Sequence, residues 1–228
     1  MDYYLEHTMQ LYLDSANIKE IEIINSYGFI NGITTNPSLL AKEDPSLSIK
    51  ELIVSIYKTI GGHVSVEVNS TDTTGMLKEA EDILSWFPEA TIKIPMIPNG
   101  LAAVKELSRQ EIPTNVTLIF TAMQALAANN AGASYVSVFV GRLDDIGTDG
   151  MIAVKDTCEI WDRHGLESQI IAASIRHPIH ILDCAKAGAD IATVPYKVLS
   201  QILHHSLTDS GLASFISDHK KMLAAKEQ

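Results

Sequence analysis

The sequence predicts an α/β fold, a (β/α)8 TIM barrel with an additional C-terminal helix. Two observations favour this class. The chain has 228 residues, close to the roughly 250 that one such barrel commonly needs, and 46% of them are hydrophobic. Short apolar runs alternate with amphipathic segments along the whole chain, which is typical of parallel strands joined by helical crossovers. We therefore expect residues 1–228 to form one domain.

Eight candidate strands follow from the apolar runs. In order they are Leu11–Asp14, Gly32–Asn36, Val64–Asn69, Ala90–Pro95, Thr114–Ile119, Tyr135–Phe139, Ile170–Ser174 and Ile191–Pro195. Helical patterns lie between them, and their ends carry stop signals: Ile18–Tyr27 before Gly28, Ile49–Ile60 before Gly61, and Thr74–Phe87 before Pro88. Right-handed crossovers between that many parallel strands allow the sheet to close into a barrel.

A doubly wound open sheet is the alternative fold. No GxGxxG motif follows the first strand, so dinucleotide binding has no support. Residues 208–228 are apolar at Leu212, Phe215, Ile216 and Leu223, and predict a surplus helix that packs on its own barrel or on a neighbouring subunit.

Composition excludes several classes of partner. The formal net charge of -11 opposes nucleic acids and acidic membranes. No apolar run approaches the ~20 residues that span a bilayer. Residues 1–10 carry Asp2 and Glu6 and lack the basic start of a secretory signal, so we interpret them as an N-terminal extension. Cys158 and Cys184 show no metal spacing and indicate reduced thiols in a cytoplasmic protein.

Lys93 is the most informative residue, because it interrupts the apolar strand Ala90–Pro95. Burying an ammonium is unfavourable unless the group is paired or gives up its proton. A neutral lysine amine can attack a ketone and form a Schiff base. Taken alone, a structural lysine that pairs with an acid or reaches the strand end is the simpler interpretation.

Polar residues on the other strands favour the functional interpretation. Side chains alternate along a strand, so one face of each strand is apolar and the other carries polar groups. These groups gather at the carboxyl ends of their strands, where barrel active sites lie. Seven strands contribute them: Asp14, Thr34 and Asn36, Glu67, Lys93, Asn115 and Thr117, Ser137, and Ser174 and Arg176.

With these residues in place, the chain resembles the transaldolase family, and its length resembles the small-subunit branch that includes fructose 6-phosphate aldolase. The resemblance rests on motifs from about Leu11 onward. They are LYLDSA at 11–16, GITTNPS at 32–38, IKIP at 92–95, GLAA at 100–103, VFVGRLDD at 138–145 and AASIR at 172–176.

The resemblance implies catalytic roles for four residues. Lys93 corresponds to the lysine that forms the Schiff base, and Asp14 to the general base acting on the substrate hydroxyl. From the residues alone, Asp14 is equally well explained as a cap of the following helix. Glu67 and Thr117 correspond to the pair that holds a catalytic water.

The resemblance also implies the substrate contacts. Asn36, Asn115 and Ser137 correspond to residues that bind the dihydroxyacetone hydroxyls, and Thr34 and Phe139 lie with them. Structural bracing of the strand ends is the alternative for these polar groups. Arg142, Ser174 and Arg176 correspond to the phosphate site, where guanidinium groups suit a dianion. A salt bridge from Arg142 to Asp144 or Asp145 is the competing explanation.

Four positions favour a transferase over a lyase. Transaldolases resemble this chain in carrying glutamate at Glu67, serine at Ser137, phenylalanine at Phe139 and arginine at Arg176, where free aldolases carry other residues. The resemblance thus implies a transaldolase of the non-oxidative pentose phosphate pathway that acts on sugar phosphates. Free fructose 6-phosphate cleavage and a non-catalytic phosphosugar-binding barrel are the alternatives. We expect no cofactor or metal, and the resemblance implies a homo-oligomer, a pentamer or a decamer.

Overall fold

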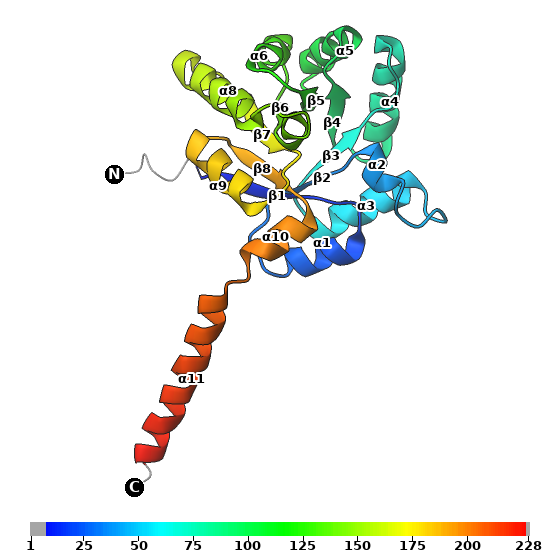
Figure 1. Ribbon diagram of the computed structural model, residues 1–228. Helices are drawn as coiled ribbons and strands as arrows, with labels where there is room; N and C mark the ends of the chain where they lie inside the picture. The colour runs from blue at the N-terminus through cyan, green and yellow to red at the C-terminus, as the bar shows by residue number, and fades with distance from the viewer. Residues whose placement is uncertain (1–7, 227–228) are drawn as a thin grey trace.

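The computed structural model describes residues 8–226, and in it the strands form a closed parallel barrel, β1 to β8 in chain order. Figure 1 shows the strands in the middle of the molecule with helices around them. The predicted (β/α)8 barrel is confirmed. The strands are β1 Gln10–Asp14, β2 Gly32–Thr34, β3 His63–Glu67, β4 Thr91–Pro95, β5 Thr114–Ile119, β6 Tyr135–Phe139, β7 Gln169–Ala173 and β8 Ile191–Val194.

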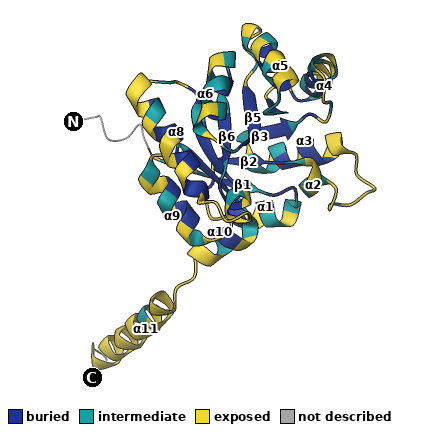
Figure 2. Cartoon of the chain, turned by 45° about the horizontal axis from the view of Figure 1, so that its top comes forward, coloured by how far each residue is buried: buried dark blue, intermediate teal, exposed yellow. Residues whose placement is uncertain are grey.

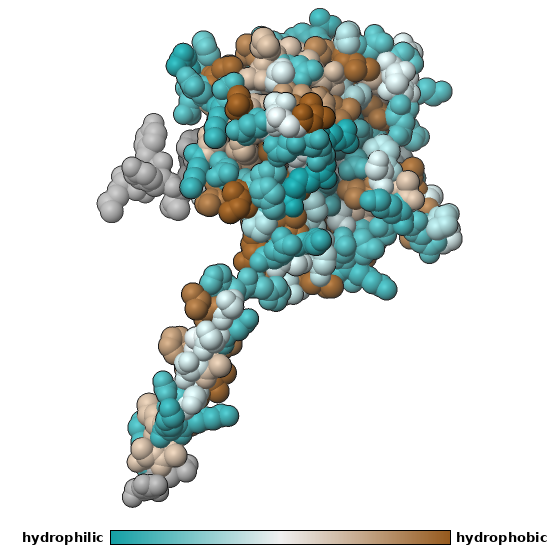
Figure 3. Space-filling view, in the orientation of Figure 1, coloured by the Kyte–Doolittle hydropathy of each residue, from teal (hydrophilic) through white to brown (hydrophobic). Residues whose placement is uncertain are grey.

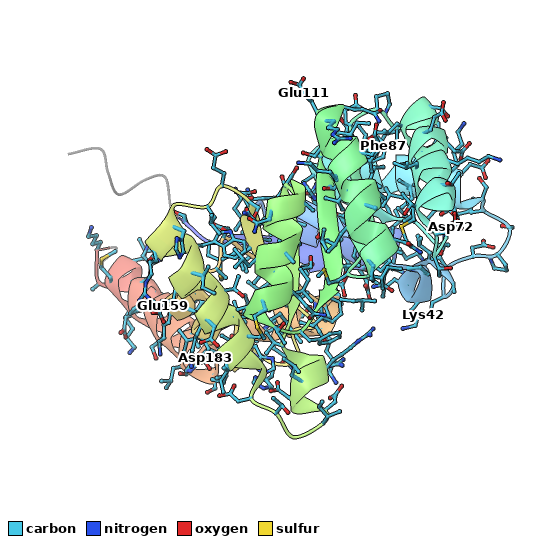
Figure 4. All side chains as sticks on the ribbon, turned by 90° about the horizontal axis from the view of Figure 1, so that it is seen from above. Lys42, Asp72, Phe87, Glu111, Glu159 and Asp183 are labelled. Carbon is cyan, nitrogen blue, oxygen red and sulfur yellow. The ribbon has the colours of Figure 1, made fainter. Side chains whose placement is uncertain are left out.

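Helices follow each strand. They are α1 Ile18–Asn25, α2 Pro37–Leu40, α3 Ile49–Ile60, α4 Thr73–Trp86, α5 Pro98–Arg109, α6 Ala122–Ala131, α7 Gly141–Asp144, α8 Gly150–His164, α9 Pro178–Ala187, α10 Tyr196–Ile202 and α11 Ser206–Lys226. The ends of α3 match the prediction. Ser48 and Glu51 form a capping box at its start, and Gly61 ends it in the left-handed conformation. Figure 4 labels Asp72 and Phe87, the capping residues at the two ends of α4.

Some predicted boundaries change. Gln10 pairs with β8 and begins β1, so the predicted extension is too long by at least this residue; residues 1–7 lie outside the described part of the chain. β2 stops at Thr34 because Asn36 caps α2 instead of extending the strand. β7 stops at Ala173, since Ser174 turns into the left-handed region with φ 60°.

Apolar side chains form a shell between the barrel and its helices. Figure 2 shows buried residues in dark blue on the strands and on parts of the surrounding helices. A second, smaller cluster of Tyr12, Ile171 and Ile191, with Tyr135 against it, lies inside the barrel. Tyr135 and Ile191 begin their strands, and Tyr12 and Ile171 lie at the middle of theirs. The amino-terminal half of the barrel interior is therefore packed, and the polar side chains lie toward the carboxyl ends.

The helix α11 projects away from the barrel (Figure 1) and has no buried residue. Large apolar side chains stand at positions 212, 215 and 216 and again, seven residues after the last two, at 222 and 223, which places them along one side of the helix. Figure 3 shows brown atoms along the length of this helix. We call this set the α11 stripe; its members are Leu212, Phe215, Ile216, Met222 and Leu223.

Two smaller findings concern the thiols and membranes. Cys158 on α8 and Cys184 on α9 are buried free cysteines, and burial raises the pKa of each thiol to about 12. Among residues 8–226, no helix combines the length and the apolar character needed to cross a bilayer.

Candidate active site

A cavity of about 420 Å³ opens at the carboxyl ends of the barrel strands. Eleven of the twelve residues that the sequence nominates for the site line it. They are Asp14, Thr34, Asn36, Glu67, Lys93, Thr117, Ser137, Phe139, Arg142, Ser174 and Arg176. The alternation of strand side chains thus brings these residues together, as predicted.

Lys93 lies at the floor of the cavity with only 6% of its surface exposed. Its Nζ atom is 2.9 Å from Glu67 Oε2 and donates a hydrogen bond of 2.8 Å to the Thr35 carbonyl. The strand register explains the ion pair, because Glu67 and Lys93 are direct neighbours across β3 and β4. The lysine is therefore paired with an acid, and its amine still faces the cavity.

Asp14 ends β1 and accepts a 2.8 Å hydrogen bond from Thr34 Oγ1. Asn17 caps α1, so the helix-capping explanation of Asp14 is wrong. Burial raises the pKa of Asp14. Lys93, the Thr34 hydrogen bond and the more distant Lys42, labelled in Figure 4, act in the opposite direction, while Glu67 adds to the rise. A carboxyl group with a raised pKa next to a lysine suits proton transfer.

Thr117 contributes a hydroxyl at the cavity wall. Its Oγ1 atom is buried and has no hydrogen-bond partner within residues 8–226. Buried polar atoms normally have a partner, so an unpaired hydroxyl in a cavity is available to a ligand or a water molecule.

Asn115 is the exception among the nominated residues. It is fully buried and does not line the cavity. Its amide oxygen accepts a 2.7 Å hydrogen bond from Ser137 Oγ, and its amide nitrogen donates to Ser65 Oγ at 3.1 Å. Asn115 thus lies behind Ser137, which does line the cavity.

Asn36 has a structural contact as well as a place on the cavity wall. Its side chain accepts a 3.0 Å hydrogen bond from the Leu39 amide and caps α2. The bracing that the sequence leaves open for Asn36 is therefore present. Its amide nitrogen is not used in this cap, since the oxygen accepts the bond.

The two arginines stand at one side of the cavity. The Arg142 guanidinium lies 5.2 Å from the centre of the Phe139 ring. The Arg176 Nη2 atom is 2.9 Å from Asp145 Oδ2, while Asp144 pairs with His180 at 3.0 Å. The predicted competing salt bridge thus exists on Arg176 and not on Arg142. Both arginines are exposed enough to meet an incoming anion.

The backbone brings this part of the site close together. A Cβ atom on Gly141 would lie 2.3 Å from the Ser174 carbonyl and 2.5 Å from the Arg176 side chain. Only glycine permits this approach of α7 to the end of β7. Ser174, with its positive φ, turns off the strand at the same point and lines the cavity.

Eight residues of the cavity wall were not nominated from the sequence, and two of them, Thr193 and Leu118, are the most informative. Thr193 on β8 lies 2.6 Å from Thr34 Oγ1, and period-two alternation within Ile191–Val194 already gives the signal for it. Leu118 reaches the cavity because its φ is 61° and the register between β5 and β6 shifts there. No sequence signal indicates that irregularity.

Comparison with known proteins supports the family resemblance that the sequence motifs indicate. A family model described as Transaldolase/Fructose-6-phosphate aldolase matches residues 11–228. A probable transaldolase of Clostridium botulinum (strain Eklund 17B / Type B) is 52% identical over 214 residues, which cover 94% of this chain and 99% of the relative. A probable transaldolase 1 of Listeria monocytogenes serotype 4b is 51% identical over 92% of this chain and 97% of its own length. A probable transaldolase of Methanococcus maripaludis is 49% identical over the same shares of the two chains.

Proposed function

The chain belongs to the transaldolase/fructose-6-phosphate aldolase family, and from this premise we propose that it is a transaldolase. It transfers a dihydroxyacetone unit from a ketose phosphate, such as sedoheptulose 7-phosphate or fructose 6-phosphate, to an aldose phosphate. The observation that carries the proposal is the buried Lys93 amine on the cavity floor, 2.9 Å from Glu67.

The proposed reaction begins with a Schiff base. The Glu67 carboxylate accepts a proton from the Lys93 ammonium, and the neutral amine attacks the ketose carbonyl carbon. The carbinolamine that forms then loses water and becomes the imine. Glu67 and Thr117, which both line the cavity, handle the proton and the water in this step.

Cleavage of the carbon–carbon bond follows. The Asp14 carboxylate takes the proton of the donor hydroxyl, the aldose phosphate departs, and the bonding electrons move into the imine to give an enamine. The enamine then attacks the aldehyde of the acceptor, and Asp14 returns its proton to the new hydroxyl. Hydrolysis of the product imine restores Lys93.

The arginine side of the cavity binds the phosphate group in this proposal. Arg142 and Arg176 supply two guanidinium groups, and Ser174 adds a hydroxyl. These cations are needed because the chain as a whole is acidic, with a net charge of -11.

Transfer is favoured over release of free dihydroxyacetone by the residues around the amine. Phe139 lines the cavity and packs edge-on against Phe120, with ring centres 5.6 Å apart. Its phenyl ring has no hydrogen that it can give to the enamine, and its apolar surface excludes water. The three relatives described above are named probable transaldolases, which points the same way.

We further propose that the enzyme is a cytoplasmic homo-oligomer of the non-oxidative pentose phosphate pathway. The α11 stripe supports the oligomer, since such an apolar row on a free helix is a good surface for a second copy. The two buried free thiols are consistent with a reducing compartment.

Borohydride reduction tests the function. With fructose 6-phosphate present, reduction is expected to fix a three-carbon adduct on Lys93, located by mass spectrometry of peptides. Lys93→Met abolishes the adduct and turnover, while the exposed Lys105→Met serves as the matched control and retains both. In the same assay, donor cleavage by the unmodified enzyme should depend on the aldose phosphate acceptor.

Three outcomes contradict the proposal in different ways. An adduct on another lysine means that the site is wrong. Cleavage of fructose 6-phosphate at an equal rate without an acceptor identifies a free aldolase. Binding of the sugar phosphate without any adduct identifies a non-catalytic barrel.

A further inference from the structure

A chain of hydrogen bonds runs inside the barrel from the cavity to its packed amino-terminal half. Ser137 Oγ donates to Asn115 Oδ1 at 2.7 Å, Asn115 Nδ2 donates to Ser65 Oγ at 3.1 Å, and Ser65 Oγ lies 2.8 Å from His63 Nε2. Ser65 and Asn115 are fully buried, and Ser137 is 2% exposed. Water therefore cannot replace a partner between Ser137 and Ser65 without displacing a side chain, whereas His63 at the end of the chain is partly exposed.

The direction of these bonds is the same along the whole chain. An asparagine amide has one accepting and one donating end, so the bond at one end sets the bond at the other. Ser65 accepts from Asn115, and within residues 8–226 His63 Nε2 is the one acceptor within reach of its single hydrogen. Because Ser65 is fully buried, an unpaired hydrogen there is unfavourable, so His63 Nε2 offers a lone pair. At the other end, Ser137 donates its single hydrogen to Asn115, so it can offer only lone pairs to a ligand in the cavity.

The surroundings of His63 favour the neutral ring that this direction requires. The ring lies between Tyr12 and Tyr135, with ring centres 5.1 Å and 4.7 Å away. Burial lowers the pKa of His63 to about 4, and burial likewise raises the pKa of both tyrosines, so all three rings are uncharged near neutral pH. Packing is tight here, because a Cβ atom on Gly32 would lie 2.8 Å from the Tyr12 ring and 3.0 Å from His63 Cβ.

We propose that His63 is a positioning residue for the donor sugar. Acting through Ser65 and Asn115, it makes Ser137 a hydrogen-bond acceptor, which receives a hydrogen from a hydroxyl of the bound ketose. If the Nε2 atom of His63 carried a hydrogen, Ser65 would accept it and lose the acceptor for its own hydrogen. Turning the Asn115 amide around would give that hydrogen a new acceptor, and Ser137 would then present a hydrogen to the cavity instead. This inference rests on the proposed function for the identity of the ligand, but its structural part does not.

Kinetics of four variants test the relay. His63→Phe keeps a ring between the tyrosines and removes the accepting nitrogen, whereas His63→Gln retains an accepting atom. Loss of one neutral hydrogen bond corresponds to roughly a two- to tenfold change. We expect His63→Phe to raise the KM for fructose 6-phosphate by about that factor, with little change in kcat or in the KM of the aldose phosphate, and His63→Gln to restore it. Ser65→Ala should raise the donor KM as much as His63→Phe does. The double variant that combines His63→Phe with Ser65→Ala should have the same donor KM as Ser65→Ala alone.

Tyr12→Phe is the packing control, because it alters the same cluster and leaves the relay intact. The relay is refuted if His63→Phe leaves the donor KM unchanged, if His63→Gln fails as His63→Phe does, or if Tyr12→Phe has an equal effect. A separate readout does not depend on activity: NMR of nitrogen-labelled histidine in the unmodified protein should find the His63 proton on Nδ1 at neutral pH. A proton on Nε2 overturns the inference. A Lys93 adduct with unchanged KM values refutes the relay alone, whereas absence of any adduct refutes the proposed function.

Discussion

Asp14 shows how a single residue of the site affects the free energy of unfolding. Its carboxyl group has a raised pKa in the folded protein, and burial is the main cause. An acid whose folded pKa lies above its unfolded value destabilises the fold when ionised, and that penalty disappears once the pH falls below the unfolded value of about 3.9. Near neutral pH, Asp14 therefore lowers the free energy of unfolding.

Asp14→Asn should remove this penalty. The amide keeps an oxygen that can accept from Thr34, and it carries no charge. We expect a larger free energy of unfolding than in the unmodified protein at pH 7, a difference that shrinks as the pH falls through the raised pKa and vanishes near pH 4. Urea unfolding at both pH values measures this. Turnover should fall by about two to four orders of magnitude if Asp14 is the general base.

Asp209→Asn, at an exposed position on α11, provides the control for removal of one carboxylate. An Asp14→Asn protein that is less stable than the unmodified one at pH 7 would mean that attraction to Lys93 outweighs the burial of the carboxylate.

At the level of residues, the sequence predicted the cavity wall well and the layer behind it poorly. Lys93, Glu67 and Asp14 could be placed because strand alternation and strand ends are visible in the sequence. That Asn115 lies behind Ser137 depends on the stagger between β5 and β6, which no local pattern encodes. The pairing of Asp145 with Arg176 joins residues 31 positions apart, and proximity in sequence had pointed to Arg142 instead.

Among the elements, two backbone irregularities shape the wall of the cavity. Ser174 at the end of β7 and Leu118 in β5 both have positive φ, and each breaks the alternation that the rest of its strand obeys. A non-glycine residue in this conformation is uncommon and depends on its surroundings. The middle of each strand could therefore be predicted from periodicity, whereas the positive φ of Ser174 and Leu118 could not.

The α7 segment also sets how free Arg176 is to bind an anion. Asp145, directly after α7, holds its guanidinium, and a phosphate must displace or share this contact. Because the pair is half exposed, its loss changes affinity by at most about 1 kcal/mol. We expect Asp145→Asn to lower the KM for fructose 6-phosphate by up to about fivefold, and Arg176→Ala to raise it by about one to two orders of magnitude.

Dihydroxyacetone, used as an unphosphorylated donor, separates the two explanations of these effects. Its KM should change little in either variant, because it carries no phosphate. Equal effects on both donors would instead show that Asp145 and Arg176 brace the loop.

For the whole molecule, the prediction of one closed barrel followed from the number and order of the strands. The length and apolar pattern of α11 were also apparent in the sequence. The direction in which it leaves the barrel was not, since it lacks buried contacts and no pattern within one chain specifies a partner surface.

A charge on the α11 stripe tests the proposed assembly. Phe215 is 76% exposed in the single chain, so Phe215→Glu should leave the barrel intact and shift the oligomer to smaller species. Ser217→Glu adds the same charge on the opposite side of the helix and should not. Sedimentation velocity measures both. Equal behaviour of the two variants, or a monomeric unmodified protein, would exclude the stripe as an interface.

The composition of α11 has a consequence for how the protein responds to dilution. Gly211 and the serines at 210, 214 and 217 disfavour a helix compared with alanine, so contacts on its apolar side must supply much of its stability. The equilibrium between coil and helix in α11 then depends, by mass action, on the concentration of the surface that covers its apolar side. On dilution, the helical ellipticity should therefore fall and a protease should cut more easily near Leu203, while the barrel itself stays folded.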